Sequence, residues 1–248
     1  TALSLAQKEG FAEPDPTFDI SGQDAAQKTC ILAILSFFKH AVIENVHYEG
    51  IDNISSQDID YGKQLQLVLK PLSIGMSKDN KFTLGSFPAF VKEKSLLASI
   101  QNESNAVLMN TESTGGTMYA GPGAGAKPTS NSVLTDIIDI ARGKIFDYQE
   151  FVKTSLDASF EDFLCGHYLR MEVSDEAGVI AKISTVMAEN GLSIDNLIQK
   201  ELDKKEDVIP LVIVTSNSEE KVIQKVISDL RELSEVKNSI SHLRILDI

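Results

Sequence analysis

The chain has 248 residues, of which 42% are hydrophobic and 24% are charged, with a formal net charge of −13. This composition is typical of a folded globular protein, and the length suits one large domain or two ordinary ones. The acidic balance, with no basic stripe interleaved with aromatic residues, argues against a nucleic-acid partner.

Several features that the sequence lacks bear on the cellular compartment of the protein. No apolar run approaches the roughly 18 residues of a membrane span, and no signal peptide opens the chain. Cys30 and Cys165 lie far apart and no histidines pair at ligand spacing, so we predict a cytoplasmic protein without a metal site. The chain opens on Thr1, without Met, in a helical pattern that Gly10 ends, which favours a fragment of a longer protein.

In chain order, the first half predicts helices and strands separated by turns. An apolar helix at 21–39 places Ile31, Leu35 and Phe38 at helical spacing. A short polar helix follows, and then an alternating strand that ends near Pro71. The later elements are strands at 81–91 and 104–110, a turn-rich segment at 114–121, and a helix at 131–143 that Gly143 ends.

The second half begins after 144–166, where the pattern loosens, and it has a more regular rhythm. Strands rich in β-branched residues alternate with amphipathic helices, and Ser218 has the spacing of a capping-box residue. The order β-α-β-β-α-β predicts a ferredoxin-like fold. The elements are expected at 168–174, 177–191, 192–202, 207–216, 218–233 and 240–246.

Acidic residues gather just before the first strong helix, in the segment GFAEPDPTFDISGQDAAQK. Asp24 and Lys28 share one helix face, and Gly22 lets the chain approach the helix at an unusual angle. Glu13 precedes a proline, which holds it extended, and Asp19 lies between this loop and the helix. Two interpretations stay open. The carboxylates either cap the helix and form a surface ion pair, or bind a cationic polar molecule such as an amino acid.

The same stretch resembles the signature of homoserine dehydrogenases, A-xxx-G-aromatic-A followed by D-P-xx-D-aliphatic-x-G-x-D-xxx-K. The resemblance continues through nearly all of residues 1–148. The segment KEKSLLASIQ stands where the family usually has a His-Pro-Leu-Ala run, which we interpret as a change of loop and not of chemistry. The matching residues are Ala6, Gly10, Phe11, Ala12, Asp15, Pro16, Asp19, Ile20, Gly22, Asp24 and Lys28.

This resemblance implies an α+β catalytic domain with a mixed sheet. It also implies hydride transfer between a nicotinamide cofactor, NADP or NAD, and aspartate semialdehyde, which gives homoserine. By motif position, Lys28 would be the general acid that protonates the forming alkoxide. Asp24 and Glu13 would hold the lysine and the substrate, and Asp19 would receive the substrate ammonium group.

The segment GPGAGAKPT precedes a predicted helix N-terminus, where backbone N–H groups can approach a cofactor. It lacks the spacing of a dinucleotide fingerprint, and the pattern alone favours a tight turn. The resemblance implies a loop that closes over the nicotinamide side, through Gly121, Gly123 and Gly125. Because no such fingerprint occurs in the sequence, we expect that the cofactor domain is missing and that this chain alone does not turn over.

The second half resembles an ACT domain, a small regulatory fold that binds amino acids. The matching residues are Asp175, Gly178 and Val179 in the first β-α loop and Asn196 in the second strand. The residues alone also fit a simpler interpretation, in which Asp175 caps a helix and Gly178 eases a turn. The resemblance implies threonine as the inhibitor and homo-oligomers built by paired ACT domains.

Together these features predict an N-terminally truncated catalytic domain at 1–148, a linker at 149–166 and an ACT domain at 167–248. The competing hypothesis is a non-enzymatic amino-acid sensor on a dehydrogenase-like platform. Lys28 argues against it because a sensor needs no proton donor, and an upstream cofactor-binding region in the gene would decide between the two. The sequence does not decide between NADP and NAD, and it does not fix the effector or the oligomer size.

Overall fold

The structure of the chain, a computed structural model, describes residues 2–9, 14–102, 104–144, 152, 154–199 and 207–248. The first half contains α1 (Ala2–Glu9), α2 (Thr17–Ile20), α3 (Gln23–Phe37), β1 (His47–Tyr48), α4 (Ser56–Gln64), β2 (Leu67–Lys78), β3 (Lys81–Lys92), β4 (Ser104–Thr111), β5 (Gly115–Pro122) and α5 (Ala126–Ala141). The second half contains β6 (Leu164–Ser174), α7 (Val179–Glu189), β7 (Ile194–Gln199), β8 (Val208–Glu219), α8 (Glu220–Arg231) and β9 (Ser241–Leu246).

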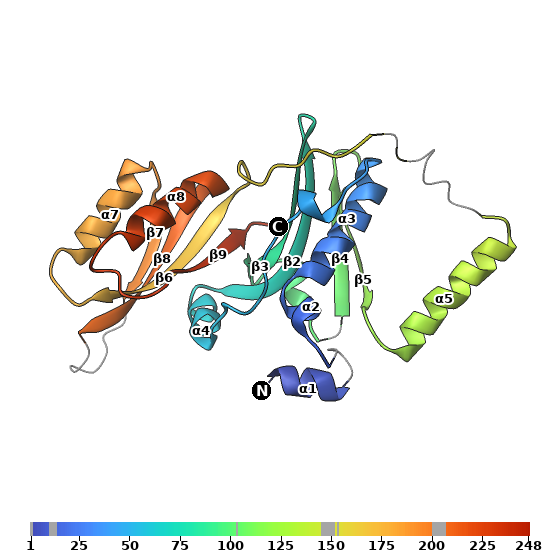
Figure 1. Cartoon of the computed structure of the whole chain (residues 1–248), viewed down its shortest axis with the longest axis horizontal. Helices are drawn as coiled ribbons and strands as arrows, with labels where there is room; N and C mark the ends of the chain where they lie inside the picture. Colours follow the sequence, from blue (N-terminus) through green and yellow to red (C-terminus); the bar gives the residue numbers. More distant parts are fainter. Residues whose placement is uncertain (1, 10–13, 103, 145–151, 153, 200–206) are drawn as a thin grey trace.

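A mixed seven-stranded sheet runs through both halves of the chain (Figure 1). The hydrogen-bonded order is β1-β3-β9-β6-β8-β7. Strands β1 and β9 pair with successive parts of one edge of β3, and β2 pairs with its other edge. Strands β4 and β5 form a separate two-stranded sheet. Helix α3 packs on the first half, α7 and α8 pack on the second, and α5 stands away from the body of the molecule (Figure 1). The expected α+β class with a mixed sheet is confirmed.

Helix α3 follows Gly22, whose φ of 82° is a left-handed conformation that favours glycine. The helix buries small side chains, among them Ala26 and Ala33, against β3. Its larger apolar side chains Ile31 and Leu35 are 58% and 51% exposed. The apolar spacing therefore predicts the helix, but the buried face is the one whose small side chains let the helix lie close to the sheet.

Other first-half elements differ from their predicted bounds. Strand β2 does not end near Pro71, because this residue lies on an outer strand opposite Pro88, where a missing N–H group is tolerated. The turn-rich segment at 114–121 forms β5 and pairs with β4. Helix α5 begins at Ala126, earlier than expected, because Pro128 falls in its first turn, where proline fits.

The second half folds as a β-α-β-β-α-β unit whose strands lie in the order β9-β6-β8-β7, all antiparallel. The ferredoxin-like prediction is confirmed. Helices α7 and α8 pack Ile183 and Ile223, both almost fully buried, onto this sheet. The predicted capping box is wrong, because Ser218 still lies in β8 and α8 begins after Glu219, which makes no side-chain cap.

Two hydrophobic clusters join the halves, beside one cluster that belongs to each half. Strands β3 and β9 pair in parallel, with Ala89 opposite Arg244. The clusters behind this pairing mix side chains of both halves, such as Phe90 with Tyr168. The segment expected to be a linker contributes Leu156, which is buried in the cluster under α3. Within the described ranges, no helix is long and apolar enough to cross a membrane.

Candidate functional site

The turn that starts α3 is fixed by contacts between backbones. An added Cβ on Gly22 would lie 2.5 Å from the carbonyl oxygen of Glu49, and one on Gly50 would lie 2.5 Å from that of Ile20. The N–H group of Ile51 donates a hydrogen bond to the same Ile20 oxygen at 3.0 Å. Both glycines are therefore required here, because any side chain would push the two segments apart.

The predicted acid–base pair lies on the first turns of this helix. Lys28 Nζ donates to Asp24 Oδ2 at 2.5 Å, and the two side chains are 69% and 36% exposed. The pair thus lies at the surface of the described chain, on the helix whose start is held by the two glycines. An exposed ion pair of this kind adds little stability, so its value lies in the charges that it presents.

The other predicted carboxylates are distributed around this helix start. Asp19 lies in α2, directly before the turn at Gly22. Asp15 accepts hydrogen bonds from the hydroxyl and the N–H group of Thr17, which lower the pKa of its carboxyl group. Glu13 lies outside the described residues. None of the described carboxylates caps α3, whose N-cap residue is Gly22, but the surface ion pair of the same interpretation is present between Asp24 and Lys28.

Of the predicted cofactor residues, Gly121 lies in β5, and Gly123 and Gly125 lie in the loop from β5 to α5. A Cβ on Gly121 would meet nothing within 4 Å, whereas one on Gly123 would collide with the side chain of Asn105. Gly125 precedes α5 with a φ of 113°, so the loop depends on glycine at this position. The free space at Gly121 and the N-terminus of α5 are compatible with contact to part of a cofactor. The described residues here form a loop and not a complete cofactor site.

The predicted effector residues lie in two places: Asp175, Gly178 and Val179 follow the end of β6, where Ser174 pairs with Val208, whereas Asn196 pairs with Val214 further along β8. Gly178, with a φ of 96°, is the N-cap residue of α7 and makes no side-chain cap bond, so Asp175 does not cap this helix. Val179 is buried in the core. Asn196 is exposed on β7, next to an irregularity in the pairing of β7 with β8. Val179 therefore acts through packing, and the other three lie where a ligand has access.

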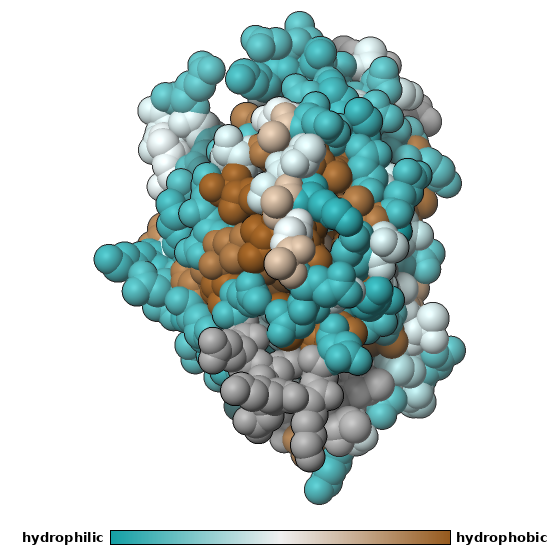
Figure 2. All heavy atoms as spheres, turned by 90° about the vertical axis from the view of Figure 1, so that its left-hand side faces the viewer, coloured by the Kyte–Doolittle hydropathy of each residue, from teal (hydrophilic) through white to brown (hydrophobic). Residues whose placement is uncertain are grey.

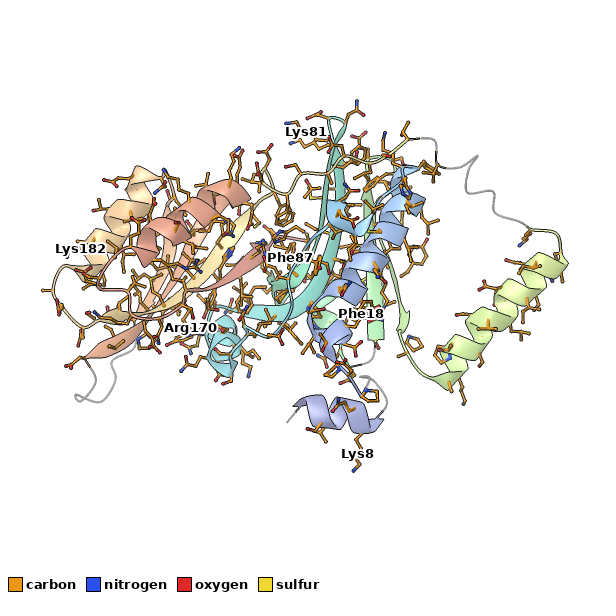
Figure 3. The ribbon with its side chains drawn as sticks, in the orientation of Figure 1. Lys8, Phe18, Lys81, Phe87, Arg170 and Lys182 are labelled. Carbon is orange, nitrogen blue, oxygen red and sulfur yellow. The ribbon has the colours of Figure 1, made fainter. Side chains whose placement is uncertain are left out.

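A buried ionic cluster at the junction of the halves was missed by the sequence analysis. Arg244 of β9 is fully buried and donates to both carboxylate oxygens of Glu220, at 2.7 and 2.9 Å. The same guanidinium donates to Glu49 at 2.7 Å, and its Cζ lies 4.4 Å from the ring centroid of Phe87. Figure 3 shows Phe87 between the two halves. No local spacing signals a contact between residues so far apart in the chain.

In this cluster, burial and hydrogen-bond partners shift the pKa values of the carboxyl groups in opposite directions. Burial raises the pKa of Glu49, but hydrogen bonds from His47 and Arg244 outweigh it and hold the pKa well below its usual range. The pKa of Glu220 is likewise lowered, because Arg244 outweighs the effect of burial. Both carboxylates therefore stay ionised beside the guanidinium. Removing one member of such a cluster leaves a buried charge without compensation.

A second buried ion pair joins the halves at α4. Asp58, which is fully buried, accepts from Arg170 Nε at 2.6 Å and from the Tyr168 hydroxyl at 3.1 Å. It also caps α4 together with Ser55. A cleft of about 620 Å³ lies beside both junction pairs, lined by Glu49 and Arg170 among others, and of the described substrate residues neither Asp19 nor Asp24 lines it. Within the part that the structure describes, no group of side chains could hold a metal ion.

The comparisons with known proteins agree with this arrangement. The family model described as homoserine dehydrogenase matches residues 1–138, and the ACT domain model matches 167–235. The chain belongs to the homoserine dehydrogenase family. A homoserine dehydrogenase from Pseudomonas aeruginosa is 32% identical over 256 residues, which cover 98% of this chain and 58% of that protein. One from Bacillus subtilis is 33% identical over 250 residues, covering 98% of this chain and 57% of that protein.

Among solved structures, a homoserine dehydrogenase from Thiobacillus denitrificans superposes with a TM-score of 0.88 at 30% sequence identity. The match covers 99% of this chain and 57% of that one. The chain thus spans less than two thirds of the homoserine dehydrogenases that it matches.

Proposed function

We propose that this chain is the substrate-binding and regulatory part of a homoserine dehydrogenase. The reaction converts L-aspartate semialdehyde to L-homoserine, a step toward threonine, methionine and isoleucine. The observation that carries this proposal is the ion pair of Asp24 and Lys28 on α3, at the end of a fully matched signature and close to Asp19 in the chain.

The roles of these residues follow from their charges. Lys28 carries its ammonium group on an exposed side chain and donates a proton to the oxygen of the aldehyde as it becomes an alkoxide. Asp24 holds that ammonium at 2.5 Å and so limits its positions. Asp19 binds the substrate ammonium group, and Glu13 holds the substrate beside the lysine. A nicotinamide dinucleotide, when bound, exchanges the hydride with the carbonyl carbon.

The cofactor is NADP or NAD, and this chain contacts only its nicotinamide side. Gly121, Gly123 and Gly125 would approach it through their backbone. A separate dinucleotide-binding region supplies the rest of the site, and without it the chain does not turn over. The division into a catalytic part at 1–148, a connecting part at 149–166 and an ACT domain at 167–248 belongs to the same proposal, as does a cytoplasmic location.

The ACT domain binds threonine through Asp175, Gly178 and Asn196, with the buried Val179 supporting the loop from the core, and this binding inhibits the enzyme. Its helix α7 exposes Ile180, and its outer strand β7 carries Ile194 and Leu197, which are half-buried against the core. Figure 2 shows apolar surface gathered at this end of the molecule. An outer strand with such surface supports a homo-oligomer in which ACT domains pair side by side.

Calorimetric titration of this chain with homoserine and with threonine tests the proposal. We expect homoserine binding that Asp19→Asn weakens about tenfold or more, because a charge-assisted hydrogen bond is lost. We expect threonine binding that Asn196→Ala weakens and Asp19→Asn leaves unchanged. Threonine binding with no homoserine binding would instead favour an amino-acid sensor.

A hydride-transfer assay of the longer gene product tests the chemistry. Lys28→Met removes the proton donor, so kcat should fall about 100-fold or more. The KM for homoserine should change much less, because the lysine acts on the forming alkoxide. An unchanged kcat would remove Lys28 from the mechanism.

A further inference from the structure

The segment directly after β1 contacts two distant parts of the molecule. Its backbone packs against the turn that starts α3, through the hydrogen bond from Ile51 to Ile20 and the close approach of Glu49 to Gly22. The side chain of Glu49 binds Arg244 of the ACT half at 2.7 Å. One residue therefore joins the helix that carries Lys28 to the regulatory half.

The regulatory side of this contact is held rigidly. Arg244 is fixed by two hydrogen bonds to Glu220 of α8, and its guanidinium lies over the rings of Phe87 and Phe160. Charge-assisted bonds in a buried site are strong and directional. If β9 or α8 shifts, the guanidinium shifts too, and its charge-assisted hydrogen bond at 2.7 Å draws Glu49 with it.

The helix side of the contact is equally tight. Gly22 and Gly50 leave no space between the two backbones, so the segment at 49–51 cannot move without moving the start of α3. Asp24 and Lys28 lie within the first turns after this point. A displacement of the ACT half is thus transmitted to the Asp24–Lys28 pair through the Arg244–Glu49 hydrogen bond and the close backbone approach of Glu49 to Gly22.

We propose that Glu49 and Arg244 are positioning residues, which hold the Asp24–Lys28 pair in place and transmit the arrangement of the ACT half to it. This rests on the proposed function, in which Lys28 acts on the substrate. The coupling is reciprocal, so a ligand at the α3 site also changes the free energy of the ACT arrangement.

Glu49→Gln and Glu49→Ala test this role without unfolding the chain, because Arg244 keeps Glu220 as its partner. Asp58→Asn is the matched control. It removes one carboxylate charge from the other buried pair between the halves, which touches α4 and not the start of α3. Unfolding midpoints establish that all variants are folded.

Two measurements are made on each variant of the full 248-residue chain. Lysines are dimethylated with ¹³C, which keeps their charge, and the Lys28 signal is assigned with Lys28→Arg. Homoserine affinity is measured by calorimetry. We expect Glu49→Ala to move the Lys28 signal and weaken homoserine about fivefold or more. Glu49→Gln should restore part of both effects, and Asp58→Asn should leave both unchanged.

The proposal is overturned if the Glu49 variants leave the Lys28 signal in place, or if Asp58→Asn moves it as much. Absence of homoserine binding in the unaltered chain would count against the proposed function alone. The Lys28 signal would still report whether Glu49 positions α3, because it is measured without ligand.

Discussion

Gly22 leaves no room for a side chain, and this makes it the residue on which the start of α3 depends. Its φ of 82° and the 2.5 Å approach of a Cβ to Glu49 are two separate obstacles. Gly191, with a φ of 70° and no atom within 4 Å of its Cβ, has only the first. The two glycines therefore separate the cost of backbone conformation from the cost of collision.

We predict that Gly191→Ala lowers the free energy of unfolding by about 1–2 kcal/mol, the cost of a left-handed residue. Gly22→Ala should cost at least about 1 kcal/mol more, because the two backbones must also separate. Urea unfolding of both variants measures the difference. Equal losses would mean that the contact with Glu49 carries no strain.

His167 is a residue whose burial makes the stability of the chain depend on pH. It is fully buried on β6, and burial lowers its pKa to about 4 from an ordinary value of 6.5. The groups that face it are Cys165, Ser218, Glu220, His242 and Arg244. In the folded chain the ring stays neutral over a range of pH where the unfolded chain already binds a proton.

The sign of the pH effect follows. The stability contribution of neutral His167 is complete above pH 6.5 and is lost as the pH falls toward about 4. The loss is on the order of 3 kcal/mol. His167→Gln should flatten the dependence of unfolding free energy on pH over this range. A slope that His167→Gln does not alter would contradict this.

At the scale of elements, α5 and α7 contrast. Helix α5 ends in a left-handed Gly143, with hydrogen bonds from Gly143 to Ile140 and from Lys144 to Asp139. This is a complete Schellman termination, and the sequence predicted the glycine correctly. Yet α5 buries none of its side chains, whereas the shorter α7 buries Val179, Ile183 and Met187.

We predict that amides of α5 exchange with deuterium at least about tenfold faster than those of α7, although α5 is longer. An isolated helix of this length is marginal in water, and tertiary packing supplies most helical stability. Hydrogen exchange with mass spectrometry measures both helices in one experiment. Equal protection would show that another surface covers α5.

Particular elements show what the sequence could predict. The second half was predicted strand by strand, because its alternation and its glycines are local signals. Gly22 and the pair of Asp24 and Lys28 were also found, because helical spacing places them. The link between Glu49 and Arg244 was not found, since a contact between distant segments depends on how the strands assemble. Ser218 failed as a cap because β8 extends through it.

At the scale of the whole molecule, the shared sheet predicts that the halves unfold together. Leu84 lies in the core under α3 and Ile183 in the core under α7, and both are almost fully buried. Leu84→Ala and Ile183→Ala should each lower the unfolding free energy by about 2–5 kcal/mol. Amide signals of both halves should disappear at one common urea concentration in each variant. Separate midpoints would mean that the junction is weaker than its contacts indicate.

The parallel pairing of β3 with β9 also limits how the chain can be shortened. Cutting away the second half would uncover the N–H and C=O groups of β3 along an apolar strand that contains Phe90 and Val91. An open edge of this kind recruits other strands and promotes aggregation. The second half therefore shields the first half from self-association, and a shortened chain would need a replacement edge to remain monodisperse.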